Sequence, residues 1–496
     1  FLYNILMIAR KIIFVLTFTF CLAPALLFSD EGIMEAAADE NSVTSSQYQA
    51  NKIEAFTAED FQSPTFRNYL LAILTTQFDN ILLSFYNRTI VVQAYATTNL
   101  DVMWHNITNP WVWDDDEFNI NQAGHPYQGS MYHQGARANG LNFYESLGTA
   151  AFGSLTWELL MENETPSYND IIITPIMGSM FGEILYRLYL DTSGKIPLLP
   201  VIIAPQAALY HFVTGQPCPN FSDSHIQNFS LGVGSGLYHD FVNGTDSGQL
   251  FNNHNNPQLL LNVSLNYGDV YKETTFTPFE SFSFNAIGGL NFPSSYIVFL
   301  NGKASLFTLV PDYNLKTAYS LDLIYQYHDV FNEINFSNNA LGATIQQIIE
   351  FNENTSIEWK EQLQFAFLTG YDCHHLLKYG YDKRYDPFGR EQRLYDLGIG
   401  VGNDASFSFK NPTIGNFTVE TYAGIFKTLP VSVQTEGSNG FSAIEYISLD
   451  YEHAIYKNLY FGINSLFYFR QAFYDDLENY TQFMNDTSAF IRYKFL

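Results

Sequence analysis

The chain has 496 residues, of which 23 are Lys or Arg and 50 are Asp or Glu, so its formal net charge is −27. So acidic a chain is a poor partner for nucleic acid, because phosphate binding depends on clustered Lys and Arg. Aromatic residues make up 17% of the chain and charged residues only 15%, whereas soluble domains carry about a quarter charged residues. Such a composition is expected where aromatic girdles meet lipid head groups.

Residues 1–29 have the order of a secretory signal peptide. Arg10 and Lys11 precede the apolar run IIFVLTFTFCLAPALLF, and Ser29 follows it before the acidic Asp30. A positive start, a short apolar core and a small residue ahead of a polar segment are the marks of an export signal. A membrane-anchoring helix is the alternative, but the run is short and Pro24 breaks it.

The composition and the hydrophobic spacing of the remaining chain change twice, and these changes predict its domains. Residues 30–64 are acidic and polar with few aromatic residues, which predicts a flexible linker. Residues 65–224 carry apolar blocks at helical spacing, broken by Pro and Gly, and predict a small membrane-associated helical module. From residue 225 to residue 496 apolar and polar residues alternate, as in strands. Removal of the signal would leave Cys218 and Cys373, which could pair or stay free.

Helical spacing predicts one long helix that begins near Pro126, runs to about Asn163 and has a soft break near Gly148. The residues on one face of it are His133, Arg137, Gly140 and Tyr144. A second helix is predicted to start at Thr174-Pro175, and the uncharged residues 196–222 are expected to form an amphipathic or re-entrant segment at the mouth of the strand domain. Small residues let helices approach closely, and those expected at helix contacts are Gly129, Gly140, Gly178 and Gly182.

The polar residues of the helical module allow two interpretations. In the first they form a lipid-modifying site for acyl hydrolysis or transfer, with a histidine as base, a serine as nucleophile and an orienting carboxylate. The candidates for those roles are His125, Ser130, His133, Glu158 and Asp170. In the second, which is favoured because no G-x-S-x-G, H-E-x-x-H or P-loop motif is present, they form a buried polar network between helices. Its members would be His125, His133, Arg137, Glu158, Asp170, Glu183 and Arg187.

No cofactor and no metal site are expected. The residues Asp372, Cys373, His374 and His375 could bind a metal, but a solvated loop at the rim of the strand domain is the favoured interpretation. The stretch WVWDDDEF, residues 111–118, could hold a divalent cation. A solvated acidic turn beside interfacial tryptophans is the simpler account of it.

The alternation of the C-terminal half is the strongest pattern in the sequence. In LLLNVSLNY, Leu261, Val263 and Leu265 alternate with polar residues, and YSLDLIYQY (319–327) repeats the pattern. A soluble β-sandwich would place strongly charged residues on its outward face, whereas the polar face here is mostly Asn, Ser, Gly, Gln and Tyr. Each segment has about ten residues, which is what a tilted strand needs to cross the hydrocarbon layer.

The ends of these segments also indicate a membrane barrel. Tyr267, Tyr271, Tyr325 and Tyr327 stand where a membrane girdle would lie. The last residues, SAFIRYKFL, resemble the aromatic strand by which outer-membrane barrels are recognised for assembly, although the chain ends in Leu496. Because lipid cannot satisfy an open sheet edge, the sheet must close. The sequence therefore predicts an all-β transmembrane barrel of about twelve antiparallel strands over residues 225–496, with membrane lipid and the barrel-assembly machinery as partners.

The series HPYQGSMYHQGARANGLNFYES and WELLMENETPSYNDIIITPIMGSMFGEILYR is similar to the module called domain of unknown function 3943, found in Gram-negative envelope proteins. The residues that carry the resemblance, over about residues 100–215, are His125, Pro126, Gly129, Tyr132, Ala136, Arg137, Gly140, Trp157, Glu158, Asp170, Thr174, Pro175, Gly178, Gly182 and Glu183. RLYDLGIGVG (393–402) resembles a strand motif of the accompanying barrels. The resemblance implies an outer-membrane location and a helical module joined to a barrel. It implies no reaction, because the activity of the family is uncharacterised.

These patterns predict an outer-membrane barrel with a helical module that plugs or braces it. Transport or permeability is the leading functional hypothesis, because polar inward-facing strand positions could line a path that the module gates. A role in envelope structure and a lipid-modifying enzyme are the alternatives. Conductance would favour the first, and turnover of envelope lipid would favour the last.

Overall fold

The structure is a computed structural model that describes residues 64–91, 94–196, 198–244, 256–291, 295–311, 315–330, 334–373, 393–433 and 437–495. The predicted signal peptide and all but the last residue of the predicted linker lie outside the described residues. So do His374 and His375, two of the four residues considered for a metal.

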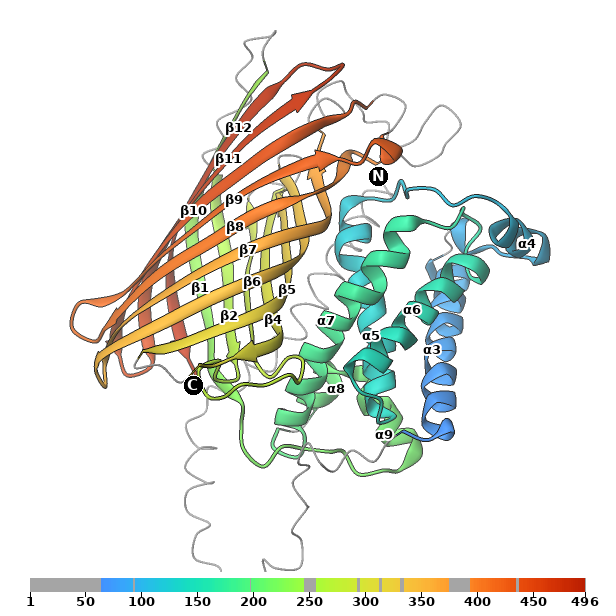
Figure 1. Ribbon diagram of the computed structural model, residues 1–496, viewed down its shortest axis with the longest axis horizontal. Coiled ribbons are helices and arrows are strands. Elements are labelled where there is room, and N and C mark those ends of the chain that lie inside the picture. The colour runs from blue at the N-terminus through green and yellow to red at the C-terminus, as the bar shows by residue number, and fades with distance from the viewer. Residues whose placement is uncertain are drawn as a thin grey trace, which may run out of the picture.

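A closed antiparallel barrel makes up the C-terminal half of the chain (Figure 1). Among the described residues twelve strands pair in chain order, and β12 returns to pair with β1, where Ser235 lies opposite Ala489. The strands are β1 (Ile226–Gly244), β2 (Asn256–Tyr267), β3 (Phe282–Asn291), β4 (Ser295–Leu309), β5 (Lys316–Val330), β6 (Ile334–Asn352), β7 (Thr355–Asp372), β8 (Tyr395–Asn411), β9 (Gly415–Thr428), β10 (Gly440–Tyr456), β11 (Leu459–Tyr474) and β12 (Tyr480–Lys494). The predicted strand number and closure are confirmed.

Hydrogen bonds across the barrel identify its inner face. On β5, Gln326 Nε2 donates to the hydroxyl of Tyr446 on β10, at 2.8 Å, so Gln326 points into the lumen. Adjacent strand residues point to opposite faces, and Tyr325 and Tyr327 therefore point outward. Tyr325 donates to the backbone oxygen of Gln122 in the helical region, at 2.6 Å. The helices thus contact the outside of the barrel wall.

Inward-facing side chains fill the barrel interior over much of its height. The buried members of this interior cluster are Tyr238, Ile297, Phe299, Ile324, Val330, Ile334, Phe336, Ala340, Ala366, Tyr371, Tyr422, Phe426, Ile444, Tyr446, Tyr468 and Met484. Beside them Arg470 and Asp372, both fully buried, pair at 2.7 Å. Asp372 therefore has an ion-pair partner inside the barrel and does not stand in a solvated rim loop. Side chains, and not helices, occupy this part of the lumen.

The N-terminal half is helical, and its four longest helices run side by side next to the barrel wall (Figure 1). The α-helices are α3 (Phe66–Tyr86), α4 (Leu100–Thr108), α5 (His125–Ala138), α6 (Phe143–Leu160), α7 (Tyr168–Thr192), α8 (Leu199–Ile203) and α9 (Pro205–Thr214). The short helical turns are η2 (Asn87–Val91), η3 (Ala94–Ala96), η4 (Ile120–Gly124) and η5 (Pro430–Ser432), of which the last lies between strands. We call α3, α5, α6 and α7 the bundle.

The helix next to the barrel is α7, and its contacts exclude a plug. The ring of Phe181 lies edge-on against that of Tyr325, with centroids 4.7 Å apart. Apolar residues of α7, among them Met177 and Met180, share one core with outward residues of β2 to β5, among them Val263 and Leu323. Of the predicted alternatives, a plug and a brace, only the brace fits this position. Among the described helices only α7 has both the length and the mean hydropathy typical of a single membrane-crossing helix, and 67% of its most apolar window is buried.

Three expectations about the helices were wrong. The helix predicted from Pro126 to Asn163 is two helices, because α5 ends at Ala138 and Gly140, at φ +86°, makes the turn into α6. The helix predicted to start at Thr174-Pro175 begins earlier, where the side chain of Ser167 accepts from the Asp170 amide. The segment expected at the barrel mouth forms α8 and α9, whose apolar residues pack on α7.

The predicted tyrosine girdle was also largely wrong. Tyr267, Tyr325 and Tyr327 are at most 1% exposed, so they do not face head groups. Tyr327 stacks on Phe118 with ring centroids 5.2 Å apart. These tyrosines anchor the helical region to the wall, because an outward aromatic residue can pack against a helix as well as against lipid.

Candidate functional site

A buried carboxylate joins two arginines and a histidine between α5 and α7. Glu183 on α7, which is 0% exposed, accepts from His133 Nε2 at 3.0 Å and lies 2.8 Å from Arg137 Nε. Its other oxygen lies 3.0 Å from Arg187 Nε, one turn along the same helix. A buried charge is tolerated only when it is paired and hydrogen-bonded, and this one is. We call these four residues the Glu183 cluster.

The Glu183 cluster reaches the barrel through Arg187. Its Nη2 donates to the backbone oxygen of Pro278 at 2.7 Å, and its Nη1 lies 3.2 Å from Glu280, which is 42% exposed. Pro278 and Glu280 belong to the connection between β2 and β3. One arginine therefore ties the bundle to the barrel wall.

A second polar group lies where α5 begins. His125 Nε2 lies 3.5 Å from Asp170 Oδ1, and both side chains are buried. Asp170 accepts from Ser167 Oγ and Asn169 Nδ2, and the Ser167 amide donates to Glu158 at 2.8 Å. The seven residues of the predicted polar network are thus divided between two separate groups.

The arrangement needed for acyl transfer is not assembled among the described residues. Ser130 is fully buried, and its Oγ donates to the backbone oxygen of Tyr127 at 2.7 Å. His133 directs Nε2 at Glu183, and His125 directs Nε2 at Asp170. A nucleophile needs a base within about 3 Å, and within the described residues no hydrogen bond joins Ser130 to a histidine.

Glycines bring α5 and α7 into backbone contact. A Cβ atom placed on Gly129 would lie 1.9 Å from the backbone oxygen of Thr174, and one on Gly178 would lie 2.5 Å from Gly129 Cα. One on Gly182 would lie 2.6 Å from His133 Cβ. This close approach is what lets side chains of α5 reach Glu183. Gly140, by contrast, serves the turn after α5 and not a helix contact.

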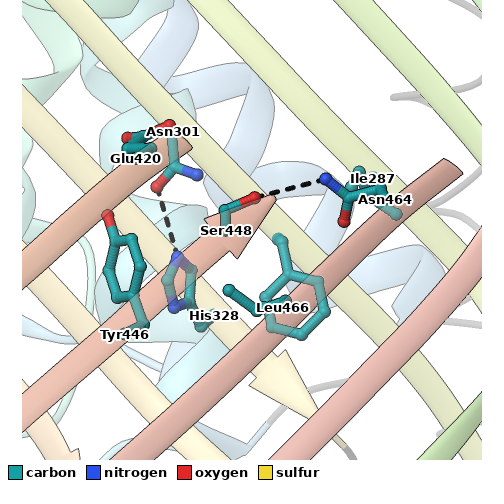
Figure 2. A pocket seen from close by; sticks show the side chains of 9 residues that line it. Ile287, Asn301, His328, Glu420, Tyr446, Ser448, Asn464 and Leu466 are labelled. Atoms are coloured by element: carbon teal, nitrogen blue, oxygen red, sulfur yellow. Dashed lines mark hydrogen bonds between the residues drawn. The ribbon is translucent and has the colours of Figure 1, made fainter. Parts of the chain in front are cut away.

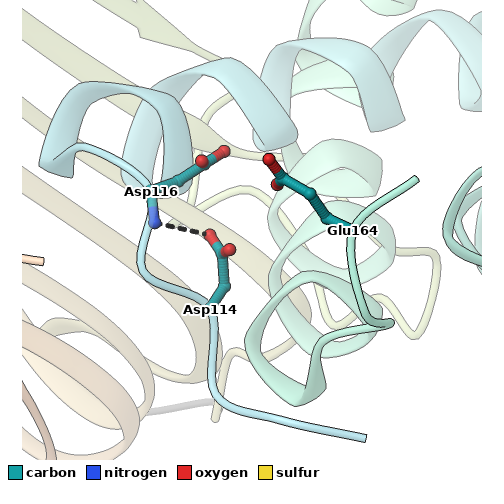
Figure 3. Close-up of side chains that lie close together, drawn as sticks. All are labelled: Asp114, Asp116 and Glu164. Carbon is teal, nitrogen blue, oxygen red and sulfur yellow. Dashed lines mark hydrogen bonds between the residues drawn. The ribbon is translucent and has the colours of Figure 1, made fainter. Parts of the chain in front are cut away.

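Three carboxylates converge in loops at the end of the bundle where α7 begins (Figure 3). Oxygen atoms of Asp114, Asp116 and Glu164 all lie within 4.8 Å of one another. A pairing of Val112 with Ser167 brings the two loops together. Such oxygens are the ligands that Ca²⁺ and Mg²⁺ prefer, so these are the residues that could hold a divalent cation. Sequence analysis missed Glu164, because only the folding back of α7 on α6 places it beside residues 114–116.

We call the loops that carry Asp114, Asp116 and Glu164 the acidic loop. Its contribution to stability should depend on pH. Partial desolvation in the loop and the nearby charges of Asp114 and Asp115 raise the pKa of Glu164 to about 7. A carboxyl whose pKa is raised by folding binds its proton more tightly in the folded state, so stability falls as pH rises from about 4.5 to about 7. Glu164→Gln should therefore raise the melting temperature of the bundle at about pH 8 more than at about pH 5.

The matched control for this prediction is Glu353→Gln, in the exposed turn between β6 and β7. That change should shift the melting temperature equally little at both pH values. If Glu164→Gln also gives the same shift at both, the proton on Glu164 is not coupled to folding.

Of the two described cysteines, Cys218 is exposed and Cys373 is buried, and no disulfide joins them to each other. Of the four residues considered for a metal, Asp372 is held by Arg470, and Cys373 packs with Ala472 and Tyr480. The described part of that stretch therefore offers no exposed pair of ligands.

The outermost helix, α3, has an inside-out pattern: it buries small or polar residues and exposes large apolar ones. The residues that it buries against the bundle are small or polar, namely Ala72, Thr76, Asp79, Asn80 and Ser84. Its large apolar side chains are instead exposed, namely Phe66, Tyr69, Leu70, Ile73, Leu74, Phe78, Ile81, Leu82, Phe85 and Tyr86. The buried polar groups have partners: Asn80 Nδ2 donates to the Gly153 oxygen at 3.0 Å, and Gln206 donates to Asp79. A water-soluble bundle has the opposite pattern.

Comparison with known families supports the resemblance seen in the sequence. The family model described as "Domain of unknown function (DUF3943)" matches residues 110–196. That range contains the acidic loop, both polar groups of the bundle and the contact between α5 and α7, while α3, α9 and the barrel lie outside it. No curated protein matches the chain.

Similar solved structures are barrels that align with about half of this chain. The TodX monoaromatic hydrocarbon channel (deltaS2 mutant) has 9% identity and a TM-score of 0.25, covering 55% of this chain and 91% of its own. The NanC porin has 8% identity and a TM-score of 0.23, covering 53% and 98%. The outer membrane protease OmpT from Escherichia coli has 7% identity and a TM-score of 0.20, covering 55% and 98%.

Proposed function

We propose that this chain, which carries a domain of unknown function 3943, is an outer-membrane protein whose barrel anchors a lipid-embedded helical bundle. Its role is in envelope structure, and the described barrel does not pass solutes freely. The inside-out pattern of α3 carries the proposal. Exposed apolar residues facing water would cost free energy at every position, whereas in lipid the same residues are solvated.

The dimensions of α3 fit this position. Its 21 residues span about 31 Å at 1.5 Å per residue, close to the roughly 30 Å of a bilayer core. In lipid, helices gain little from burying apolar residues, and associate through small residues and polar contacts. The buried face of α3, with Ala72, Ser84 and the hydrogen-bonded Asn80, has that composition.

The barrel wall away from the bundle continues the same apolar surface. Its outward side chains that are exposed include Val233, Leu237, Leu259, Leu363, Phe365, Val401, Ile425, Ile447, Phe467 and Ile491. A belt of this kind surrounds transmembrane barrels. Lipid around both α3 and the free barrel wall would place the bundle inside the membrane, with outer-membrane lipid and the assembly machinery as partners.

The filled interior argues against the permeability hypothesis in the described conformation. Tyr422 and Tyr446 stack with centroids 5.0 Å apart inside the barrel, and Arg470 pairs with Asp372 beside them. An open porin keeps a water-filled channel at this level. Purified protein in planar bilayers should therefore give no stable conductance. A steady open channel of the full chain would contradict the closed barrel.

Spin labels test the lipid exposure of α3. Leu74→Cys and Ile81→Cys, in a chain with Cys21 and Cys218 replaced by serine, should give labels that dissolved oxygen reaches and a water-soluble nickel complex does not. The control is Thr76→Cys, whose parent side chain is buried in the bundle, so that neither reagent should reach its label. If the nickel complex reaches Leu74 and Ile81 readily, α3 lies in water and the proposal fails.

A further inference from the structure

A cavity of about 60 Å³ lies inside the barrel, beside the interior cluster (Figure 2). The polar side chains that line it come from five strands and are Asn301, His328, Glu420, Tyr446, Ser448 and Asn464. Its apolar lining is Ile287, Phe299 and Leu466. Neither the structural role proposed above nor the bundle makes use of this cavity.

Solvent reaches the lumen next to the cavity. Asn285 lies opposite Asn301 across the ladder of β3 and β4, and its side chain is exposed although it points into the barrel. Asn301, Glu420 and Ser448 are half-buried. His328 and Tyr446, which belong to or contact the interior cluster, are buried and close the other side. The cavity is therefore open towards Asn285 and closed on the side of His328 and Tyr446.

His328 lines the cavity, and its ring carries a buried acceptor nitrogen beside it. Its Nε2 lies 3.2 Å from Asn301 Oδ1, which can only accept, so Nε2 carries the proton and Nδ1 is an acceptor. The side chain is 2% exposed, and Nδ1 has no hydrogen-bond partner within the described structure. A buried acceptor without a donor costs about 1–3 kcal/mol. A donor bound in the cavity would remove that cost.

The other polar groups supply donors as well as acceptors. Tyr446 accepts from Gln326 at 2.8 Å, which leaves its own hydroxyl proton to donate. Ser448 accepts from Asn464 at 3.2 Å, which leaves its proton in the same way. Glu420 adds a carboxyl, and it neighbours Asp404 and Lys360. Donors and acceptors thus surround one small space with an apolar wall.

We propose that this cavity binds a small, neutral, polyhydroxylated compound. A hydroxyl both donates and accepts, so it can satisfy His328 Nδ1 and also accept from Tyr446 or Ser448. An ammonium group could only donate, and a carboxylate or phosphate would meet the carboxyl of Glu420. Carbon–hydrogen faces of the ligand would pack on Phe299 and Leu466.

The size of the cavity limits the ligand. At about 10–15 Å³ per water-sized site, it holds about four to six non-hydrogen atoms. That is the size of a triol such as glycerol, or of one edge of a single sugar ring whose remainder stays in the open lumen. A long oligosaccharide could enter only by its end.

Saturation-transfer NMR on the full chain in detergent micelles tests the proposal, with glycerol, glucose, methylammonium and acetate as probes. Glycerol and glucose should receive saturation from the protein, and methylammonium and acetate should not. His328→Phe keeps a ring of similar shape but removes the acceptor, and should weaken glycerol binding about tenfold. Ser448→Ala should weaken it as well. The control is Ser408→Ala, at an inward position bonded to Thr418 outside the cavity, which should bind as the unchanged chain does.

Heat-modifiable migration in gels would show that each variant barrel is folded. If His328→Phe does not fold, Ser448→Ala alone decides the result. Equal glycerol binding by the unchanged chain and the folded cavity variants would overturn the proposal. Stronger transfer to methylammonium or acetate than to glycerol would overturn it too. Neither result depends on whether α3 lies in lipid, so the proposed function is tested separately.

Discussion

Gly129→Ala should separate α5 from α7 and destabilise the bundle by about 3 kcal/mol or more, at the upper end of what overpacking costs. The added Cβ would lie 1.9 Å from the Thr174 oxygen and close to Gly178 Cα. Both neighbours are backbone atoms, which cannot rotate away as the end of a flexible side chain can. The helices must move apart, and such a shift would also lengthen the contacts from His133 to Glu183. Hydrogen exchange of peptides from α5 and α7 measures the loss of protection.

Gly148→Ala is the matched control, because it makes the same chemical change in the neighbouring helix α6. A Cβ atom at Gly148 would meet nothing within 4 Å. Alanine in the middle of a helix is favoured over glycine by about 1 kcal/mol, so this variant should keep or gain protection. Equal exchange in Gly129→Ala and the unchanged chain would mean that the two helices are not in backbone contact.

The barrel could be predicted because its pattern has one cause. In a closed sheet the residues of every strand alternate between the lumen and the outer face. The alternation seen in LLLNVSLNY therefore recurs along about 270 residues, and each strand gives the same evidence for a barrel. The lateral place of the bundle could not be predicted in this way. An outward Tyr325 or Leu323 is apolar whether lipid or α7 covers it, and only the fold shows which.

The turn between α5 and α6 was within reach of sequence reasoning but was misplaced. Asn139-Gly140 is a common helix end, and Asn142 with Glu145 forms a capping box at the next helix start. Gly148 drew attention as a glycine inside an apolar block, yet it lies in open space on α6. The helix-ending Asn139-Gly140 and the capping box at Asn142 locate the break between the two helices better than Gly148, which a helix tolerates.

The Glu183 cluster shows where sequence reasoning about the candidate site ends. Glu183 and Arg187 are four residues apart on one helix, so their contact follows from helical spacing. That His133 and Arg137 reach the same carboxylate depends on how α5 crosses α7. The crossing is set by Gly129 and Gly178, and spacing along one chain does not give the angle between two helices.

Glu183→Ala should destabilise the bundle by about 3–5 kcal/mol, because it leaves two buried guanidinium groups without their shared anion. Arg187 would retain its contacts with Glu280 and the Pro278 oxygen. Protection against hydrogen exchange should fall in α5, in α7 and in the connection between β2 and β3. The barrel strands opposite the bundle should keep theirs.

Glu280→Ala is the sharpest control for Glu183→Ala, because it removes a carboxylate from the same arginine. Glu280 is 42% exposed and pairs with Arg187 at 3.2 Å, and an exposed ion pair contributes about 0–1 kcal/mol. The two variants therefore differ in burial and in the number of cations left unpaired, while Arg187 is common to both. A small loss in Glu280→Ala beside a large one in Glu183→Ala would show that Glu183 holds the bundle together. Equal, small losses would mean that water replaces the missing carboxylate, and then the centre of the bundle is not as dry as its burial implies.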